Sequence, residues 1–263
     1  MHIIIIISGK GESEIDHYSR KNPNWTADRS NGDIACDSYH QYKLDNQLVK
    51  FSISWPRILP TGDPTNVNQR GIDHYNHLID DLLVNGLIPV VTIYHWDMPQ
   101  KLMELGGWTN KIIADYYEAF ARLLFSVYGN RVRWWVTLNE PQLVSVFGYG
   151  QGLSIRPVHP PGYNHTGVGD YLAIHNFLLS HARVYHMYHK DFKHQKAYLS
   201  RVYILKAGSI LHPILSPNGD YPPVMRERVD KNSKKEGRIK SRLPHFSQDE
   251  IEFLKGTLLP HSN

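Results

Sequence analysis

The chain has 263 residues, which is enough for one large domain or two small ones. Hydrophobic residues make up 41% of the chain and charged residues 21%, the proportions of a soluble globular protein. The formal charge is +4, and the one cysteine, Cys36, excludes an internal disulfide framework and an all-cysteine metal site.

The chain begins MHIIIIISGKG. Its apolar run is too short for the core of a secretory signal peptide (about 7–15 residues) or for a membrane helix (about 20 residues). We therefore expect no signal peptide and no membrane segment in this chain. Two N-glycosylation sequons make Asn24 and Asn164 glycosylation candidates, and they favour a secreted or secretory-pathway location. With that ancestry, we expect the native N-terminus to lie upstream of Met1.

From residue 51 onward, short apolar runs alternate with amphipathic stretches. FSISW (51–55) is rich in aromatic and β-branched residues and predicts a strand. Residues 71–86 predict a helix that ends at Gly86, because six apolar residues share one helical face. They are Ile72, Tyr75, Leu78, Ile79, Leu82 and Leu83. LIPVVTIYHW (87–96) then predicts a buried strand.

The alternation continues through residue 192. Thr109 is the expected N-cap of a helix over residues 110–130, which ends at Gly129. RVRWWVTLNEP (131–141) predicts another strand. Residues 169–192 predict a long helix with helical spacing at Leu172, His175, Leu179, Ala182 and Tyr185.

This βαβαβα order indicates a parallel sheet with covering helices, and strand starts spaced by about 36 and 45 residues suit a (β/α) barrel. Near residue 197 the pattern weakens to one doubtful strand, and Ser247 and Glu250 predict a capping box before a last short helix. A closed barrel needs eight strands. We therefore expect an α/β fold, a partial (β/α)8 TIM barrel with about half of its strands, as one incomplete domain over residues 1–263.

Much of the basic excess lies in RERVDKNSKKEGRIKSR (226–242). A nucleic-acid patch is one interpretation of this tract. No aromatic residue lies between its charges and no nucleic-acid motif accompanies it. We expect a solvated lysine-rich loop and no nucleic-acid partner.

Two predicted strands end in chemically reactive groups, His95-Trp96-Asp97 and Asn139-Glu140. Active sites of parallel barrels lie at the carboxyl ends of the strands. Aromatic, amide and imidazole groups suit a sugar, and a carboxyl group can protonate a glycosidic oxygen. Each residue also has an ordinary structural interpretation: Glu140 as a helix-entry carboxylate or salt-bridge partner, His95 as a core histidine and Trp96 as packing.

The histidines at 175, 181, 186 and 189 lie on the predicted long helix. His186 and His189 are three residues apart, which is a possible spacing for two metal ligands. No carboxylate or third ligand has a matching spacing, so we expect a polar helix face and no metal site.

Five motifs in order resemble glycoside hydrolase family 1, which includes β-glucosidases, lactase-phlorizin hydrolase, myrosinases and the klotho proteins. They are GDIACDSYHQY, FSISWPRILPTG, VTIYHWDMPQKL with LGGWTN, TLNEP, and GDYPPVMRERV. The resemblance implies a (β/α)8 barrel and a retaining mechanism with two glutamates. It implies that Glu140 is the catalytic acid/base, that Asn139 and His95 bind sugar hydroxyls, and that Trp96 lines the same subsite. The substrate would be a small β-glycoside or oligosaccharide, with no metal or organic cofactor.

The chain also departs from the family pattern. The family nucleophile lies in a Thr-Glu-Asn-Gly segment, which occurs nowhere in these 263 residues, and the sugar-binding Gln-Ile-Glu-Gly turn has no counterpart. Lys50 stands where the family has an arginine that contacts the nucleophile, and lysine cannot form the same bidentate fork. We also expect internal gaps before residue 50 and near residue 197. Asp97 lies near the rim, but its spacing does not place it opposite Glu140.

Three hypotheses follow from this pattern. The chain belongs to a β-glycosidase that hydrolyses O-glycosyl compounds, and these truncated residues are inactive because the nucleophile segment is missing. Alternatively, it is a non-catalytic carbohydrate- or protein-binding module of the klotho type, or a non-functional fragment. The sugar, the aglycone and the oligomeric state are not readable from the sequence.

Overall fold

The computed structural model describes residues 10–22, 24, 48–150, 166–195, 198–199 and 208–257. Cys36, Asn164 and the GDIACDSYHQY motif lie outside the described residues. Asn24 is described and exposed. Its glycosylation stays a prediction.

The described part of the chain contains a parallel sheet in the order β1-β2-β3-β4. The strands are β1 (Leu48–Ser52), β2 (Ile88–Tyr94), β3 (Trp134–Leu138) and the two-residue β4 (Tyr198–Leu199). The expected strands over 87–96 and 131–141 are confirmed, and β4 is the doubtful strand near residue 197. Sequential parallel strands with helical crossovers agree with the expected partial barrel.

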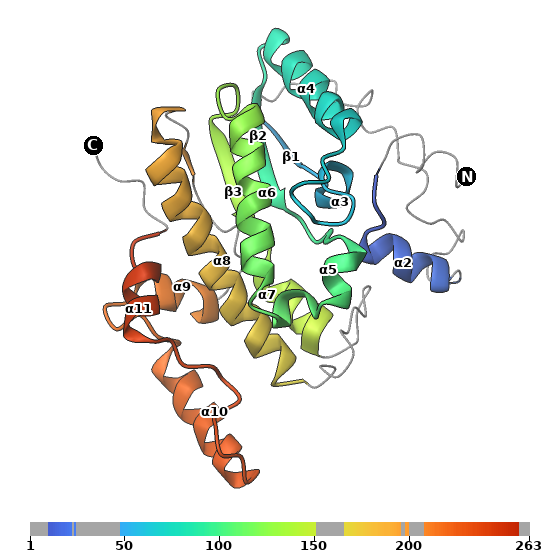
Figure 1. Cartoon of the computed structure of the whole chain (residues 1–263). Helices are drawn as coiled ribbons and strands as arrows, with labels where there is room; N and C mark the ends of the chain where they lie inside the picture. The colour runs from blue at the N-terminus through green and yellow to red at the C-terminus, as the bar shows by residue number, and fades with distance from the viewer. Residues whose placement is uncertain are drawn as a thin grey trace.

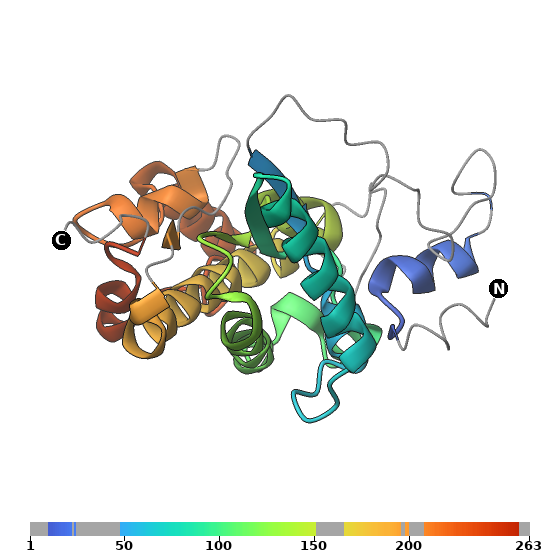
Figure 2. The ribbon, with the colours of Figure 1, turned by 90° about the horizontal axis from the view of Figure 1, so that it is seen from above.

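The helices connect and extend these strands. They are α2 (Glu14–Lys21), α3 (Trp55–Ile58), α4 (Gln69–Val84), α5 (Gln100–Glu104), η2 (Gly107–Thr109), α6 (Ile113–Tyr128), α7 (Pro141–Leu143), the π-helix η3 (Val144–Gly150), α8 (Gly169–Asp191), η4 (Lys193–Gln195), α9 (Gly208–Leu215), α10 (Pro223–Lys235) and α11 (Gln248–Leu254). Figures 1 and 2 show α9, α10 and α11 at the opposite end of the molecule from α2.

The strand predicted over 51–55 was wrong at its end. β1 stops at Ser52, and Trp55 begins α3. Pro56 lies in the first turn of α3, where a fixed φ and a missing N–H favour a helix start. A buried Trp55 also fits a short helix against the core, where its ring stacks on Phe120 with centroids 5.0 Å apart.

The helix α4 ends as predicted. Gly86 has φ 72°, its N–H donates to the Leu83 carbonyl at 3.0 Å, and the N–H of Leu87 donates to the Leu82 carbonyl at 2.9 Å. This pair of bonds is a Schellman motif, which needs a residue with positive φ. Leu83, predicted on the buried face, is exposed. The buried face of α4 is therefore narrower than the periodicity of the sequence indicated.

Thr109 does not cap the helix that follows it. Its hydroxyl donates to the Gly106 carbonyl at 2.7 Å, and α6 starts only at Ile113, after a 3-10 turn. The end of α6 at Gly129 is confirmed, because Gly129 is its C-cap. The capping box of α11 is also confirmed: Ser247 and Glu250 exchange both hydrogen bonds.

The helix α8 is buried on more of its circumference than the predicted spacing indicated. Ala182 and Tyr185 are buried as expected, but Ala173, Phe177 and His181 are also buried. The helix packs against α6 and β3 and carries the C-terminal segments on its other side. His181 is therefore a core residue and not part of a polar helix face.

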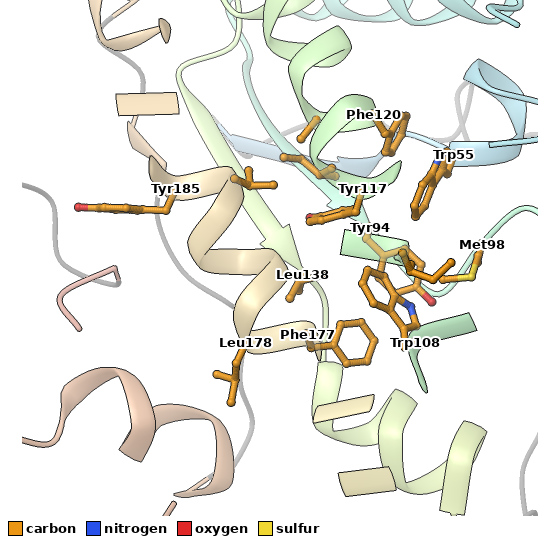
Figure 3. Packing of buried hydrophobic residues seen from close by; sticks show 14 of the residues in the cluster. Trp55, Tyr94, Met98, Trp108, Tyr117, Phe120, Leu138, Phe177, Leu178 and Tyr185 are labelled. Atoms are coloured by element: carbon orange, nitrogen blue, oxygen red, sulfur yellow. The ribbon is translucent and has the colours of Figure 1, made fainter. Parts of the chain in front are cut away.

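An aromatic cluster fills the space between the sheet and the helices (Figure 3). Trp108 packs on Phe177 at 4.2 Å between ring centroids and on Tyr94 at 5.1 Å. Tyr117 donates a hydrogen bond to the Thr137 carbonyl, which ties α6 to β3. The many aromatic residues of the chain largely form this core, which fixes the strand ends where the site lies.

The basic tract was predicted to be a loop and is mainly helical. Its first part belongs to α10, which extends away from the rest of the molecule in Figure 1. Arg226 is not solvated as expected: it forms a two-point ion pair with Asp220, at 2.9 and 2.6 Å, and donates to the carbonyls of Leu243 and Pro244.

Candidate active site

The site forms where β2 and β3 end. The N–H of Asn139 donates to the Tyr94 carbonyl at 2.9 Å, so the chain is still attached to the sheet one residue beyond β3. The apolar run WWVTL is buried after its first residue and brings Asn139 to 4% exposure. A buried amide needs hydrogen-bond partners, which makes the surroundings of Asn139 informative.

Two residues from other strands satisfy the Asn139 side chain. Lys50 Nζ donates to Oδ1 at 3.1 Å, and Nδ2 lies 3.1 Å from His95 Nε2. Lysine has only donors, so Oδ1 is the acceptor and Nδ2 is the donor. His95 Nε2 must then be an acceptor without a proton. The neutral His95 ring therefore carries its proton on Nδ1.

Trp96 adopts a backbone conformation that is unusual for its residue type. Its φ is 69°, in the left-handed region that large side chains rarely occupy. The indole Nε1 donates to the Asn139 carbonyl at 2.9 Å, which holds the half-buried ring beside the strand end. The structure therefore fixes the position of Trp96 at some cost in backbone strain.

Glu140 is the second non-glycine residue with positive φ in the described part of the chain, with φ 47° and ψ 51°. Its carbonyl accepts from the N–H groups of Leu143 and Val144 at 3.0 and 3.2 Å, so α7 begins immediately after it. The sharp turn changes the chain direction between Asn139 and Pro141, and it leaves the Glu140 side chain half-exposed. Both strained residues belong to the predicted site, and such strain gathers at functional sites.

Lys50 and Glu140 interact electrostatically. Burial lowers the pKa of Lys50, and the negative charge of Glu140 opposes that decrease. Lys50 was expected to occupy the position of an arginine that contacts the nucleophile. In this structure its ammonium group contacts Asn139.

The four predicted residues lie together: Asn139 contacts both His95 and Trp96, and Glu140 follows it in the chain. Asp97 interacts with another element. Burial raises the pKa of Tyr75 on α4 to about 12, and the Asp97 carboxylate adds to that increase. Two surface grooves, of about 520 and 760 Å³, lie elsewhere, and none of the four predicted site residues lines either of them.

Three of the four histidines of α8 have hydrogen-bond partners, and the ring of the fourth, His175, stacks on Phe246 with centroids 4.3 Å apart. His186 Nε2 lies 2.8 Å from the Phe253 carbonyl, and His189 Nδ1 lies 2.8 Å from the Tyr185 carbonyl. His181 lies between Thr137 Oγ1, at 2.9 Å, and the Thr257 carbonyl, at 3.2 Å. Within the described ranges, no group of three or more His, Cys, Asp or Glu residues could hold a metal ion.

Comparison with known proteins assigns this chain to a family. Residues 6–206 match the model of glycosyl hydrolase family 1. The chain belongs to this family. Its similarity to Myrosinase 1 of Brevicoryne brassicae is 41% identity over 95% of this chain and 59% of that protein. The human cytosolic beta-glucosidase is 36% identical over the same shares. The solved structure of aphid myrosinase superposes with a TM-score of 0.85 at 40% identity, covering 95% of this chain and 60% of that one.

These matches confirm the family resemblance and the partial α/β barrel. The chain spans about six tenths of these family 1 relatives. The alignment with Myrosinase 1 runs over 281 positions, more than the 263 residues of this chain, which agrees with the expected internal gaps. A cytosolic protein is among the relatives, so the secretory location stays a prediction. None of the described helices is both long and apolar enough to cross a membrane.

Proposed function

We propose that this chain carries the acid/base half of a retaining β-glycosidase site, whose reaction is hydrolysis of small β-glycosides or oligosaccharides. The observation that carries the proposal is the hydrogen-bonded group of Lys50, Asn139 and His95 next to Glu140 at the carboxyl ends of β2 and β3. It is supported by the family match, by the buried amide at the strand end and by the two strained residues beside it.

Glu140 protonates the glycosidic oxygen as the bond from that oxygen to the anomeric carbon breaks, and it later removes a proton from the incoming water. Asn139 Nδ2 and His95 bind hydroxyl groups of the sugar. The face of Trp96 packs against its C–H surface. Because Lys50 fixes the orientation of the Asn139 amide, the donor side of that amide is set before the substrate binds.

Retaining hydrolysis needs a second carboxyl group about 5–5.5 Å from the first. The family nucleophile segment does not occur in these 263 residues, and the spacing of Asp97 does not place it opposite Glu140. We therefore propose that the 263-residue polypeptide by itself does not turn over β-glycosides. Loss of a nucleophile costs orders of magnitude in rate.

An added nucleophile tests both parts of the proposal. The purified chain is incubated with aryl β-glucosides, with and without sodium azide, and release of the phenol is measured. Azide attacks the anomeric carbon, the bond to the aryl oxygen breaks, and the Glu140 proton passes to the leaving phenolate. We expect release at the background rate without azide and an azide-dependent increase with it.

Glu140→Gln is the control variant. It should lose the azide-dependent release of phenol itself, which needs a proton. It should keep the release of dinitrophenol, whose anion leaves without one. Hydrolysis without azide that Glu140→Gln abolishes would contradict the missing nucleophile. Azide-dependent release of phenol that is equal in both proteins would contradict the role of Glu140.

A second candidate is a non-catalytic carbohydrate-binding module of the klotho type. It is favoured by one observation, that Lys50, Asn139 and His95 form a complete hydrogen-bonded group without a second carboxylate. Isothermal titration with a non-hydrolysable thioglucoside distinguishes it. Binding that Asn139→Ala removes, in a protein that azide does not activate, supports the binding module. A non-functional fragment shows neither binding nor rescue.

A further inference from the structure

The projection formed by α10 and the segment that returns from it, residues 223–242, concentrates the positive charge of the protein. Residues 226–242 contain eight lysines and arginines and three acidic residues, a net charge of +5. The formal charge of the whole chain is +4, so the remainder is close to neutral. Figure 1 shows α10 extending away from the sheet and its helices. We call residues 223–242 the basic projection.

The end of the basic projection is held in one conformation. Gly237 has φ 72°, its N–H donates to the Lys234 carbonyl at 3.0 Å, and the N–H of Arg238 donates to the Ser233 carbonyl at 3.0 Å. The N–H of Arg242 donates to Ser233 Oγ at 3.1 Å, which ties the returning segment to α10. The charges at this end are therefore presented by a fixed backbone and not by a loose loop.

Ion pairs neutralise only part of this charge: Arg226 is paired with Asp220, which lies outside the projection. Glu236 forms ion pairs with Arg238 at 2.8 Å and with Arg242 at 3.1 Å. Four exposed lysines form no ion pair with any residue that the structure describes: Lys231, Lys234, Lys235 and Lys240. Cations in the last turn of a helix interact favourably with its macrodipole, which explains the positions of Lys234 and Lys235. It does not account for Lys240, which lies beyond the helix.

An apolar side chain lies among these cations. Ile239 is 101% exposed, and Arg238 and Lys240 flank it in the sequence. It is the most exposed of the large hydrophobic side chains in the described part of the chain, and burial of such a side chain against a second surface is favourable. A groove of about 760 Å³ beside it is lined by Arg238, Ile239, Lys240 and Arg242, together with Val168 and Leu172 of the α8 entry.

We propose that the basic projection binds the surface of a membrane that contains anionic lipids. The lysines contact lipid phosphates and carboxylates, and Ile239 enters the interface between headgroups and acyl chains. Clusters of four to eight basic residues on an amphipathic helix or next to a membrane anchor bind anionic lipids, and an exposed apolar residue supplies a second signal for surface binding. Charge complementarity requires an anionic occupant, the exposed Ile239 favours a membrane, and a flat anionic surface can contact a protruding end directly.

A nucleic acid is less well matched to the same charges. Residues 226–242 contain no aromatic side chain on which a base could stack, and an exposed isoleucine has no partner on a phosphate backbone. The proposal concerns a surface far along the chain from Glu140 and is independent of the proposed hydrolysis.

Vesicle co-sedimentation with the full chain tests the proposal. Vesicles of phosphatidylcholine alone are compared with vesicles that contain about 30 mol % phosphatidylserine. We expect binding only to the anionic vesicles, and a decrease in binding as salt is raised. Lys234→Gln/Lys235→Gln should weaken binding about 30-fold, because each lysine near an anionic surface contributes about fivefold. Ile239→Ser should weaken it about tenfold.

Matched variants control for charge and for apolar surface. Lys190→Gln/Lys193→Gln removes the same charge from exposed lysines near the end of α8, and Val84→Ser removes an exposed apolar side chain at the end of α4. Both should bind anionic vesicles like the unmodified chain. Three results would overturn the proposal. They are equal binding to both vesicle types, equal losses of binding in the two lysine pairs, and retention on duplex DNA without vesicle binding.

Discussion

The two faces of the strands β1 to β3 differ in what covers them. Register and alternation place Val49, Val91, Trp135 and Thr137 on one face, and all four are buried against helices. The opposite face carries Leu48, Ile88 and Trp134, which are 56%, 40% and 37% exposed, at the amino-terminal ends of the strands, whereas Thr92, Tyr94, Val136 and Leu138 further along the same face are buried. Lys50 lies on that same face.

This difference shows how a partial barrel can position Asn139 and Glu140. The helices on one face, and the buried cluster that includes Tyr94 and Leu138 at the carboxyl end of the other, together fix the strand ends. The opposite face, which forms the interior of a closed barrel, is exposed at its amino-terminal end and binds Asn139 through Lys50 toward the carboxyl end. The geometry of Asn139 and Glu140 therefore depends on the packing at the carboxyl ends of the strands, while the exposed amino-terminal ends contribute apolar surface without equivalent stability.

The largest expected difference in stability is between two adjacent tryptophans that lie on opposite faces of β3. Trp135 is buried, packs on Phe125 with centroids 5.0 Å apart, and donates from Nε1 to the Val132 carbonyl at 3.1 Å. Trp135→Ala should lower the free energy of unfolding by about 3–5 kcal/mol. Trp134→Ala, its matched control, should lower it by less than about 1 kcal/mol. Urea denaturation measures both, and equal losses would show that the two faces are packed alike.

The covered face should also make stability depend on pH. Burial lowers the pKa of His181 to about 4, and the hydrogen bond to the Thr257 carbonyl only partly opposes that decrease. In the unfolded chain the same histidine binds a proton near pH 6.5. The contribution of neutral His181 to the free energy of unfolding is therefore complete above pH 6.5. It is lost as pH falls toward about 4, and the total loss is about 3 kcal/mol.

His181→Gln measures this contribution. The unfolding free energies of the variant and the unmodified chain are compared between about pH 7 and pH 4.5. The variant should be less stable at neutral pH, and the difference should shrink as pH falls. A difference that is independent of pH would show that the titration of His181 is not coupled to folding.

The smallest expected effect on stability comes from Lys50, on the opposite face. Lys50→Met removes the hydrogen bond to Asn139 and should cost about 1 kcal/mol, while Lys50→Arg keeps a donor. The sharper effect is on His95, because the Asn139 amide is then free to rotate. The ring nitrogen resonances of His95 report its tautomer by NMR. A tautomer that is unchanged in Lys50→Met would contradict the orienting role of Lys50.

Local sequence patterns predicted much of the fold. The periodicity of α4 and α8 and the apolar runs of β2 and β3 identified these elements, because each pattern matches its burial. The same patterns failed at Trp55, where Pro56 favours a helix start, and in the basic tract, whose Lys, Arg and Glu residues have high helix propensity.

The candidate site was partly predictable. The ends of β2 and β3 identified His95, Trp96, Asn139 and Glu140, and the structure brings them together. The bond from Lys50 to Asn139 joins residues 89 positions apart, so only the strand register reveals it. The positive φ of Glu140 is not encoded by a glycine, and the burial of His181 depends on Thr257, far along the chain.

The configuration of the azide product tests most directly the central claim, that Glu140 acts without a partner carboxylate. The chain is incubated with an aryl β-glucoside and azide, and the anomeric coupling of the product is measured by proton NMR. We predict α-glucosyl azide, because azide attacks the face opposite the leaving group in a single displacement. β-Glucosyl azide, which requires a covalent glycosyl-enzyme and hence a nucleophile within the chain, would contradict the account.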